Sequence, residues 1–462
     1  MRKYITLCSF ILAGNMFLSA VEPRVDMPPS WTSDSIFTTI EYGDNASWWQ
    51  TFDDPVLDSL ISLGETNNYN LVAAAKRIDI ARSQLRAVRG SYAPTIGINA
   101  GYTRERQSGL MTGRSGEAST MSYFTGAATM SWEIDIFGKI RAQARHADKY
   151  VKVTAAEYAA AMVALDAEIA STYINLLVEK QQLEVAHEHT ENQAHILEIT
   201  EVRYRTGLAS KLDVAQARTL YYSTIASIPL LEASIEASYN ALGVLTGLGR
   251  EGLPQAVFST DKRPDHYQLA ALGAPLDILR RRPDIVEAER NIDLAAAELG
   301  IARSAYLPSL SLSASVGTMA HNFGDLFKGP SFTYSIVPTL SWTLFDGLQR
   351  RNTALAARQS MEARIDSYNL TVLTAIEEVR DAIARYKSSL LYIERIGNVV
   401  TSSEEEVQLS IDQYKQGLTM FSNVVDAQLN YLTYQNTLIS ARGDAISSLI
   451  SLYKALGGGW TE

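Results

Sequence analysis

The sequence predicts a mainly α-helical protein with a membrane β-barrel, in which an internally duplicated protomer contributes four strands to the barrel. Three observations predict this fold class. Two very long segments, 139–206 and 348–416, almost lack glycine and proline. Short motifs of the first half recur in the second half. Four segments alternate between apolar and polar residues, as membrane strands do.

Composition argues against several classes of protein. The 462 residues include 41 Lys and Arg against 51 Asp and Glu, a formal net charge of -10, so no nucleic-acid partner is expected. No segment after the N-terminus approaches the roughly 20 apolar residues of a spanning helix, which argues against a helical membrane bundle. The single cysteine, Cys8, excludes internal disulfides and metal sites with several thiolates.

The N-terminus has the order of a secretion signal. Met1-Arg2-Lys3 is basic, an apolar run follows, and Leu18-Ser19-Ala20 ends the segment with small residues. We therefore expect residues 1–20 to be a signal peptide and the mature chain to begin near Val21. Residues 21–92 follow as an N-terminal segment with the first helices.

Two long helical hairpins make up most of the remaining chain. At about 1.5 Å per residue, each long segment reaches on the order of 100 Å if helical, beyond the size of a compact globule. Each long helix ends at a glycine turn, Gly207 or Gly417, and a second helix returns from the turn. The hairpins span 138–247 and 347–456. A connector, a further helix and a C-terminal tail are expected at 248–282, 283–305 and 457–462.

The two halves form a tandem repeat. Tyr204-Arg205-Thr206-Gly207-Leu208 recurs as Tyr414-Lys415-Gln416-Gly417-Leu418, an offset of 210 residues (414 − 204). Ser131-Trp132 recurs as Ser341-Trp342 with the same offset. Each half therefore carries the same order of helix, two strands and a long hairpin.

The strands are expected within 93–137 and 306–346, where the polarity pattern has a period of two. In one strand Ser309, Ser311, Ser313 and Ser315 alternate with Leu310, Leu312, Ala314 and Val316. The last strand alternates in the same way from Thr333 to Leu344. One face of each strand is apolar and the other is small and hydrophilic. Aromatic residues lie near strand ends, where membrane barrels carry their girdles: Tyr102, Trp132 and Trp342.

Four strands are too few for a barrel that spans a membrane. Roughly eight strands are the minimum, and open sheet edges are not tolerated in lipid. The missing strands then come from other subunits, and a trimer would supply twelve. The same alternation also fits the half-buried sheet of a soluble protein. A soluble periplasmic coiled-coil scaffold or adaptor is therefore the alternative.

Several strings of residues occur together in the order typical of one family. They are Trp48-Trp49 with Phe52-Asp53-Asp54-Pro55, Trp132-Glu133-Ile134-Asp135-Ile136-Phe137-Gly138, Leu279-Arg280-Arg281-Arg282-Pro283-Asp284-Ile285, Ala305-Tyr306-Leu307-Pro308-Ser309-Leu310 and Tyr453-Lys454-Ala455-Leu456-Gly457-Gly458-Gly459-Trp460. Through them the chain resembles the TolC-like outer-membrane factors, the efflux channels of tripartite RND-type pumps, and most closely their NodT or lipoprotein-like branch.

The resemblance implies a homotrimer with a twelve-stranded barrel in outer-membrane lipid, a periplasmic α-barrel and an equatorial belt. It implies a passive exit duct for drugs or other small molecules, joined by a periplasmic adaptor (a membrane fusion protein) to an inner-membrane pump. It implies neither an enzyme nor a cofactor. Many relatives carry a lipidated cysteine after the signal, but here Val21 follows Ala20, so we expect no lipid anchor.

The resemblance also implies a gate at the two hairpin turns. The acidic constriction ring of the family maps onto Asp426, and the neighbouring ring position is Asn423 where relatives often have Asp. A locking hydrogen bond between the turns maps onto Asp213 and Tyr414. The alternative is that these polar residues are only the solvated turn of a helical hairpin.

Two other motifs are only weak indications of a binding site. Gly247-Leu248-Gly249-Arg250-Glu251-Gly252 has dinucleotide-binding spacing but follows a helix where that motif requires a strand. His187, Glu191 and His195 share a helix face at a spacing that could hold a metal, but no further ligands accompany them. We expect no catalytic residue, no metal and no cofactor.

Overall fold

The computed structural model describes residues 45–108, 118–264 and 281–460. The predicted signal peptide, residues 1–20, and Cys8 lie outside the described residues. The chain divides into two compact units. The sheet unit comprises the described residues within 76–155 and 288–367, and the helical unit comprises those within 45–75, 156–287 and 368–460.

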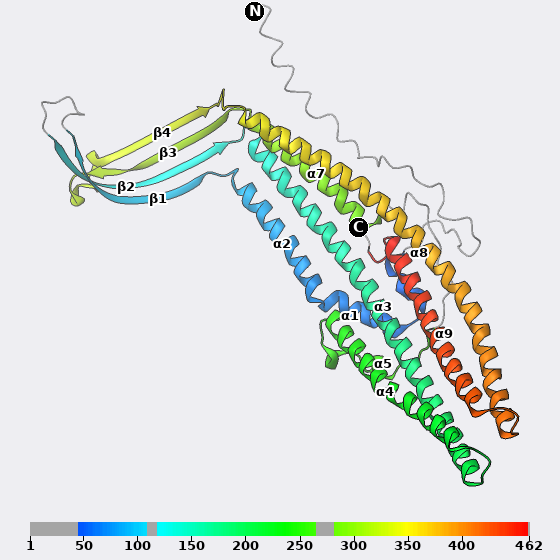
Figure 1. Ribbon diagram of the computed structural model, residues 1–462. Helices are drawn as coiled ribbons and strands as arrows, with labels where there is room; N and C mark the ends of the chain where they lie inside the picture. The colour runs from blue at the N-terminus through cyan, green and yellow to red at the C-terminus, as the bar shows by residue number, and fades with distance from the viewer. Residues whose placement is uncertain (1–44, 109–117, 265–280, 461–462) are drawn as a thin grey trace, which may run out of the picture. The chain divides into compact units, whose positions relative to one another are not determined.

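An antiparallel sheet with the order β1-β2-β3-β4 forms the sheet unit together with parts of the neighbouring helices (Figure 1). The strands are β1 (Thr95–Gln107), β2 (Ser119–Ile134), β3 (Ser309–Ala320) and β4 (Phe332–Ser341). Each half of the repeat thus supplies one hairpin. Among the described strands, β1 pairs only with β2 and β4 pairs only with β3. Both outer edges of the sheet are therefore unpaired within the described chain.

The register separates the side chains into two faces. Ile98 lies opposite Ala128, Ala128 opposite Val316, and Val316 opposite Tyr334, so one row of apolar residues crosses the whole sheet. We call this side the apolar face; it also carries Ile96, Tyr102, Met130, Leu310, Leu312, Ile336 and Leu340. The opposite face carries Asn99, Thr129, Ser311, Ser313 and Thr339. Ile98 is 86% exposed, so described residues do not cover the apolar face at this position.

The ends of two strands differ from the alternation pattern. β1 continues past Tyr102 through Arg104 to Gln107, because this polar stretch pairs with the beginning of β2. The expected extension of the last strand to Leu344 is wrong, since β4 ends at Ser341. Pairing partners, rather than the apolar pattern, decide where each ladder ends.

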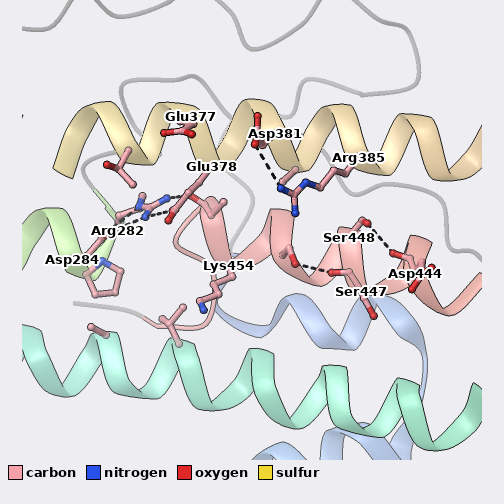
Figure 2. A pocket seen from close by; sticks show the side chains of 17 residues that line it. Arg282, Asp284, Glu377, Glu378, Asp381, Arg385, Asp444, Ser447, Ser448 and Lys454 are labelled. Atoms are coloured by element: carbon pink, nitrogen blue, oxygen red, sulfur yellow. Dashed lines mark hydrogen bonds and ion pairs between the residues drawn. The ribbon is translucent and has the colours of Figure 1, made fainter. Parts of the chain in front are cut away.

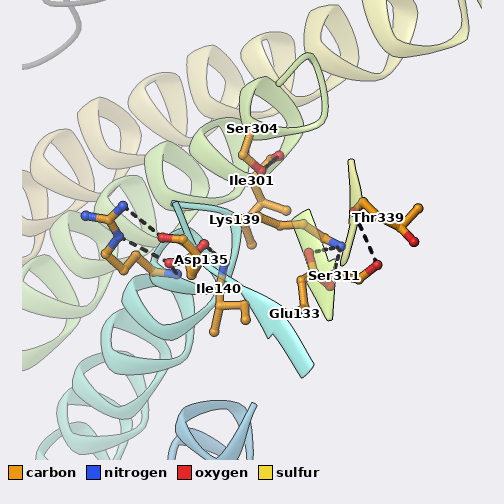
Figure 3. Close-up of polar contacts among 9 residues, drawn as sticks. Glu133, Asp135, Lys139, Ile140, Ile301, Ser304, Ser311 and Thr339 are labelled. Atoms are coloured by element: carbon orange, nitrogen blue, oxygen red, sulfur yellow. Dashed lines mark hydrogen bonds and ion pairs between the residues drawn. The ribbon is translucent and has the colours of Figure 1, made fainter. Parts of the chain in front are cut away.

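A carboxylate joins the strands of the first repeat to a helix (Figure 3). Asp135 accepts a hydrogen bond from the backbone N–H of Arg141 at 3.0 Å, near the start of α3 (Lys139–Arg205). Glu133, at the end of β2, forms an ion pair with Lys139 at 3.0 Å. A carboxylate suits this place because the N-terminus of a helix has unpaired N–H groups and a positive dipole end.

The second repeat has the same arrangement. Asp346 accepts a hydrogen bond from the backbone N–H of Arg350 at 3.1 Å, at the start of α8 (Gln349–Lys415). The side chain of Arg350 also pairs with Asp346 and donates to the carbonyl oxygen of Ala305 at 3.3 Å. The strand-to-helix junction is therefore built twice with the same chemistry.

The helices have the expected great length. α3 and α8 contain 67 residues each, about 100 Å at 1.5 Å per residue. Each is followed by a helix of 35 residues, α4 (Lys211–Leu245) or α9 (Phe421–Ala455). The shorter helices are α1 (Pro55–Asn67), α2 (Tyr69–Gly90), α5 (Gln255–Ser259) and α7 (Pro283–Ser304).

One stretch of α3 corrects the expectation that no segment after the N-terminus is apolar enough to cross a membrane. α3 contains an 18-residue window with a mean hydropathy of 1.4, long and apolar enough to cross a membrane. Of this window, 56% is buried against other parts of the chain. The apolar character serves the packing of a core helix, because the buried residues of α3 include Ile169, Tyr173 and Leu176.

The core of the helical unit contains the first described residues. Trp48, in a short 3-10 helix, stacks on Tyr453 of α9 with ring centroids 5.2 Å apart. Asp54 caps α1 by accepting from the backbone N–H of Val56 at 3.0 Å. The same carboxylate accepts from the hydroxyl of Tyr173 at 3.0 Å and pairs with Lys262 at 3.3 Å. This one buried side chain joins α1, α3 and the connector.

A second buried carboxylate has no such partners. Asp166 of α3 is completely buried, and neither of its oxygens has a hydrogen-bond partner among the described residues. Burial, with a smaller contribution from the nearby charge of Glu65, raises the pKa of Asp166 to about 8. A side chain at Gly459 would meet this carboxylate, because a Cβ there would lie 3.3 Å from Oδ2. The acid is thus enclosed in its protonated form at neutral pH.

Asp166 should make the stability of the protein fall as pH rises. Its folded pKa of about 8 is above the unfolded value of 3.8, so the folded chain holds a proton that the unfolded chain loses. Stability then decreases by up to about 1.4 kcal/mol per pH unit between these values. Asp166→Asn should remove this slope and raise the thermal unfolding temperature most at pH 8, in detergent. Glu168→Gln, at an exposed position of α3, is the control; equal pH slopes for wild type and Asp166→Asn would contradict the assignment.

Candidate functional site

Both helical hairpins turn at a glycine in the left-handed region. Gly207 has a φ of 76° and Gly417 a φ of 75°, values that residues with a Cβ rarely adopt. In the first turn the N–H of Leu208 donates to the carbonyl of Arg203 at 2.8 Å, and the equivalent bond of the second turn measures 2.9 Å. These bonds satisfy the last carbonyls of each long helix. The duplication therefore produces the same turn twice.

Asp213 occupies the first turn of α4. Ser210, the residue before the helix, accepts from the backbone N–H of Asp213 at 3.1 Å, and Asp213 accepts from the N–H of Ser210 at 3.2 Å. This reciprocal pair satisfies two N–H groups at the helix start. The carboxylate is thereby held in one orientation.

Tyr414, in the last turn of α8, reaches the same carboxylate. Its hydroxyl donates to Oδ2 of Asp213 at 3.3 Å, and its ring lies 5.0 Å from that of Phe421. Burial and, to a smaller extent, the charge of Asp213 raise the pKa of Tyr414. The hydroxyl therefore keeps its proton and stays a donor. The structure brings the two residues of the expected lock together across the two hairpins.

Arg203 adds a third contact, which the sequence pattern did not predict. Its Nη1 donates to the carbonyl of Lys415 at 2.8 Å, and its guanidinium lies 5.1 Å from the centre of the Tyr414 ring. A cation over an aromatic face and at a helix C-terminus is favourable on both counts. The signal in the sequence was a basic residue in the last turn before Gly207.

The second turn lacks the carboxylate of the first. Met420 stands before α9 and makes no capping hydrogen bond through its side chain. Asn423 replaces the acid of the first repeat, and its Nδ2 donates to Oγ1 of Thr419 at 2.7 Å. Asp426 lies one turn further on the same helix and is exposed, without an ion pair to any described residue. Neither Asn423 nor Asp426 contacts the Asp213–Tyr414 pair through a hydrogen bond.

The histidine triplet does not form a metal site. No group of three or more His, Cys, Asp or Glu side chains among the described residues could hold a metal ion. The buried histidine of α3 is His189, whose Nε2 lies 2.6 Å from Oε1 of Gln435 in α9. Burial lowers the pKa of His189. This pair is a second contact between the two hairpins, in addition to the contact between Tyr414 and Asp213.

A cavity of about 860 Å³ lies in the helical unit, beside the start of α7 (Figure 2). Arg282 is buried at its wall and contacts Asp284 at 2.7 Å and Glu378 at 2.6 Å. Its Nη1 donates to the carbonyl of Ala455 at 2.9 Å. A side chain at Gly457 would press against Arg282, at 3.0 Å from its Cα. The motif that contains Arg282 and the motif that contains Gly457 lie far apart in the chain, and they contact each other here.

These elements are those of a known family. The family model described as "Outer membrane efflux protein" matches residues 60–248 and 274–458. The chain belongs to the outer membrane efflux protein family. Membership places the chain among outer-membrane channel proteins. It therefore argues against the alternative of a soluble scaffold.

Similar members of this family extend over nearly the full chain. The "Probable efflux pump outer membrane protein TtgC" of Pseudomonas putida is 29% identical over 99% of this chain and 95% of its own length. The "Outer membrane protein OprJ" of Pseudomonas aeruginosa is 28% identical over 95% of this chain and 92% of its own length.

Solved structures of efflux-family channels share the fold. The outer-membrane channel OprN superposes with a TM-score of 0.85 at 26% identity, covering 96% of this chain and all of that chain. The open state of the Neisseria gonorrhoeae MtrE outer membrane channel superposes with a TM-score of 0.80 at 25% identity, covering 95% and 96%. The expected fold class, mainly α-helical with a membrane β-barrel, is confirmed.

Removing the helix cap should loosen the start of α4. Ser210→Ala deletes the acceptor for the N–H of Asp213, a loss of about 1 kcal/mol, so this amide should exchange its hydrogen about fivefold faster. Hydrogen exchange read by mass spectrometry of the detergent-solubilised protein measures the change. Met420→Ala, at the uncapped equivalent position, should leave the start of α9 unchanged. Equal effects at both helix starts would contradict the cap.

Proposed function

We propose that this protein is the outer-membrane exit duct of a tripartite efflux system and works as a homotrimer. The sheet with its exposed apolar face and two unpaired edges carries the proposal. Unpaired backbone groups in hydrocarbon cost several kcal/mol each, so the sheet needs strands from other subunits. Three copies would supply twelve strands, which suffice for a closed barrel.

The face opposite the apolar one would line the duct. Its residues are small and hydrophilic, among them Asn99, Thr129 and Ser313. Such a lining lets water and dissolved molecules pass without a tight binding site. The duct would conduct drugs or other small molecules passively. Relatives carry names such as "Toluene efflux pump outer membrane protein TtgC", which supports solvent-like molecules among the cargo.

The helical hairpins would extend into the periplasm and meet a periplasmic adaptor, which joins the duct to an inner-membrane pump. The gate would lie at the hairpin turns. Three copies of Asp426 around a threefold axis would form an acidic ring that attracts cations. Asn423 beside it would contribute no charge. Opening would separate the hairpins and break the bond between Tyr414 and Asp213.

The membrane role can be tested with two neighbouring residues that lie on opposite faces of β1. Ile98→Lys puts a charge on the apolar face, at a cost of about 2–4 kcal/mol near the middle of a membrane, whereas Asn99→Lys puts it in the duct. Detergent-extracted wild type and Asn99→Lys should have the native mass of three subunits, and Ile98→Lys should lose this species. A wild type that is monomeric or dimeric without detergent would contradict the duct.

The lock can be tested with the two tyrosines that the repeat makes equivalent. Tyr414→Phe removes one hydrogen bond, worth about 1 kcal/mol, and should raise the mean conductance in planar bilayers up to about fivefold. Tyr204→Phe is the matched control, because Tyr204 is exposed at the same place in the first repeat. Unchanged conductance of Tyr414→Phe would remove Tyr414 and Asp213 from the gate.

A further inference from the structure

Two arginines continue the apolar face of the sheet beyond its aromatic residues. Tyr102 lies opposite Phe124, Arg104 opposite Ser122 and Arg106 opposite Thr120. Because alternate residues of a strand point to the same side, Arg104 and Arg106 share the face of Tyr102. Both arginines are exposed and have no ion pair within the described chain.

The position of the arginines along the strand matches the edge of a membrane. Trp132 and Phe124 mark two aromatic levels on β2, eight residues apart (132 − 124), which is about 26 Å along the strand. At a tilt of about 40° this is about 20 Å along the membrane normal, close to the apolar band of about 25 Å of outer-membrane barrels. Arg104 and Arg106 lie about 7 and 13 Å further along β1 than Tyr102, at the level of lipid head groups.

The connection between β3 and β4 also indicates that this end of the sheet lies at the membrane interface. Phe323 packs against Phe124 with ring centroids 5.6 Å apart, and Phe327 packs against Phe323 at 6.2 Å. Both phenylalanines are largely exposed, Phe327 to 84%. Exposed aromatic rings next to a sheet are typical of a membrane interface. His321 holds this connection to β2, because its Nδ1 lies 2.7 Å from the carbonyl oxygen of Ser122.

The charges near the arginines favour an anionic ligand from outside the chain. Glu105 lies on the opposite face, where Gln107 donates to it at 3.1 Å, so it does not neutralise its neighbours. Lys328, in the connection, is 69% exposed and already paired with Asp325 at 2.6 Å. Arg104 and Arg106 therefore remain the free cations among the described residues at this end of the apolar face.

We propose that Arg104 and Arg106 bind the phosphate groups of the glycolipid of the outer leaflet, lipopolysaccharide. The planar guanidinium forms two parallel hydrogen bonds to a phosphate, and a lipid-facing arginine costs little at the interface. The proposal rests on the proposed function, which directs this end of the sheet outward. Three subunits would present six arginines as a ring around the barrel.

Native mass spectrometry of the detergent-solubilised full-length trimer, titrated with diphosphorylated lipid A, tests the contact. Arg104→Gln/Arg106→Gln should bind at least tenfold more weakly than wild type. Arg77→Gln, which removes an exposed arginine of α2, should bind as wild type does. Equal binding by the double variant and wild type would overturn the proposal.

Two further measurements use the wild-type protein, so they do not depend on whether the variant folds. Dephosphorylated lipid A should bind at least tenfold more weakly than the diphosphorylated form, and equal binding of the two would overturn the proposal. Millimolar inorganic phosphate should not displace lipid A; displacement would show a phosphate site rather than a lipid site. Failure to isolate a detergent-dependent trimer would instead refute the proposed function.

Discussion

The need to pair every backbone group in a hydrocarbon environment governs this molecule. Among the described residues, β1 and β4 each end the sheet with an open edge, and the apolar residues of these outer strands, such as Ile98 and Ile336, are exposed. Neither feature suits a chain alone in water. Both become favourable when copies of the chain join edge to edge in a bilayer, as proposed. The tandem repeat serves the same need, because each half adds one strand hairpin and one helical hairpin.

Duplication also allows two copies of one element to serve different purposes. The glycine turns at Gly207 and Gly417 are the same in their backbone bonds. Their helix starts differ, since the side chain of Asp213 completes a cap while the side chain of Asn423 donates to Thr419. The tyrosine of the second repeat is buried against Asp213, whereas its equivalent in the first is exposed. The two repeats thus share one backbone structure, but only the second contributes a tyrosine that bonds to Asp213. A single hydrogen bond at this contact can bias a conformational change.

The sequence motifs that carry the family resemblance lie where segments distant in the chain come into contact. Asp54 joins the cap of α1 to Tyr173 and Lys262, and Arg282 joins the start of α7 to the end of α9. A buried charge must be paired and hydrogen-bonded, so each of these side chains constrains several elements together. Asp166 is the exception, because burial without a hydrogen-bond partner in the described part of the chain leaves it protonated instead.

The sequence by itself determined the long helices, the glycine turns, the duplication and the two faces of the strands. These features follow from local rules: helix breakers, left-handed glycines and a side-chain period of two. The resemblance added the pairing of Asp213 with Tyr414. Only the tertiary structure decided that β1 continues to Gln107, that Arg203 covers Tyr414 and that Asp166 is enclosed. Strand ends and buried charges depend on partners brought from remote parts of the chain, and no local pattern of residues records those partners.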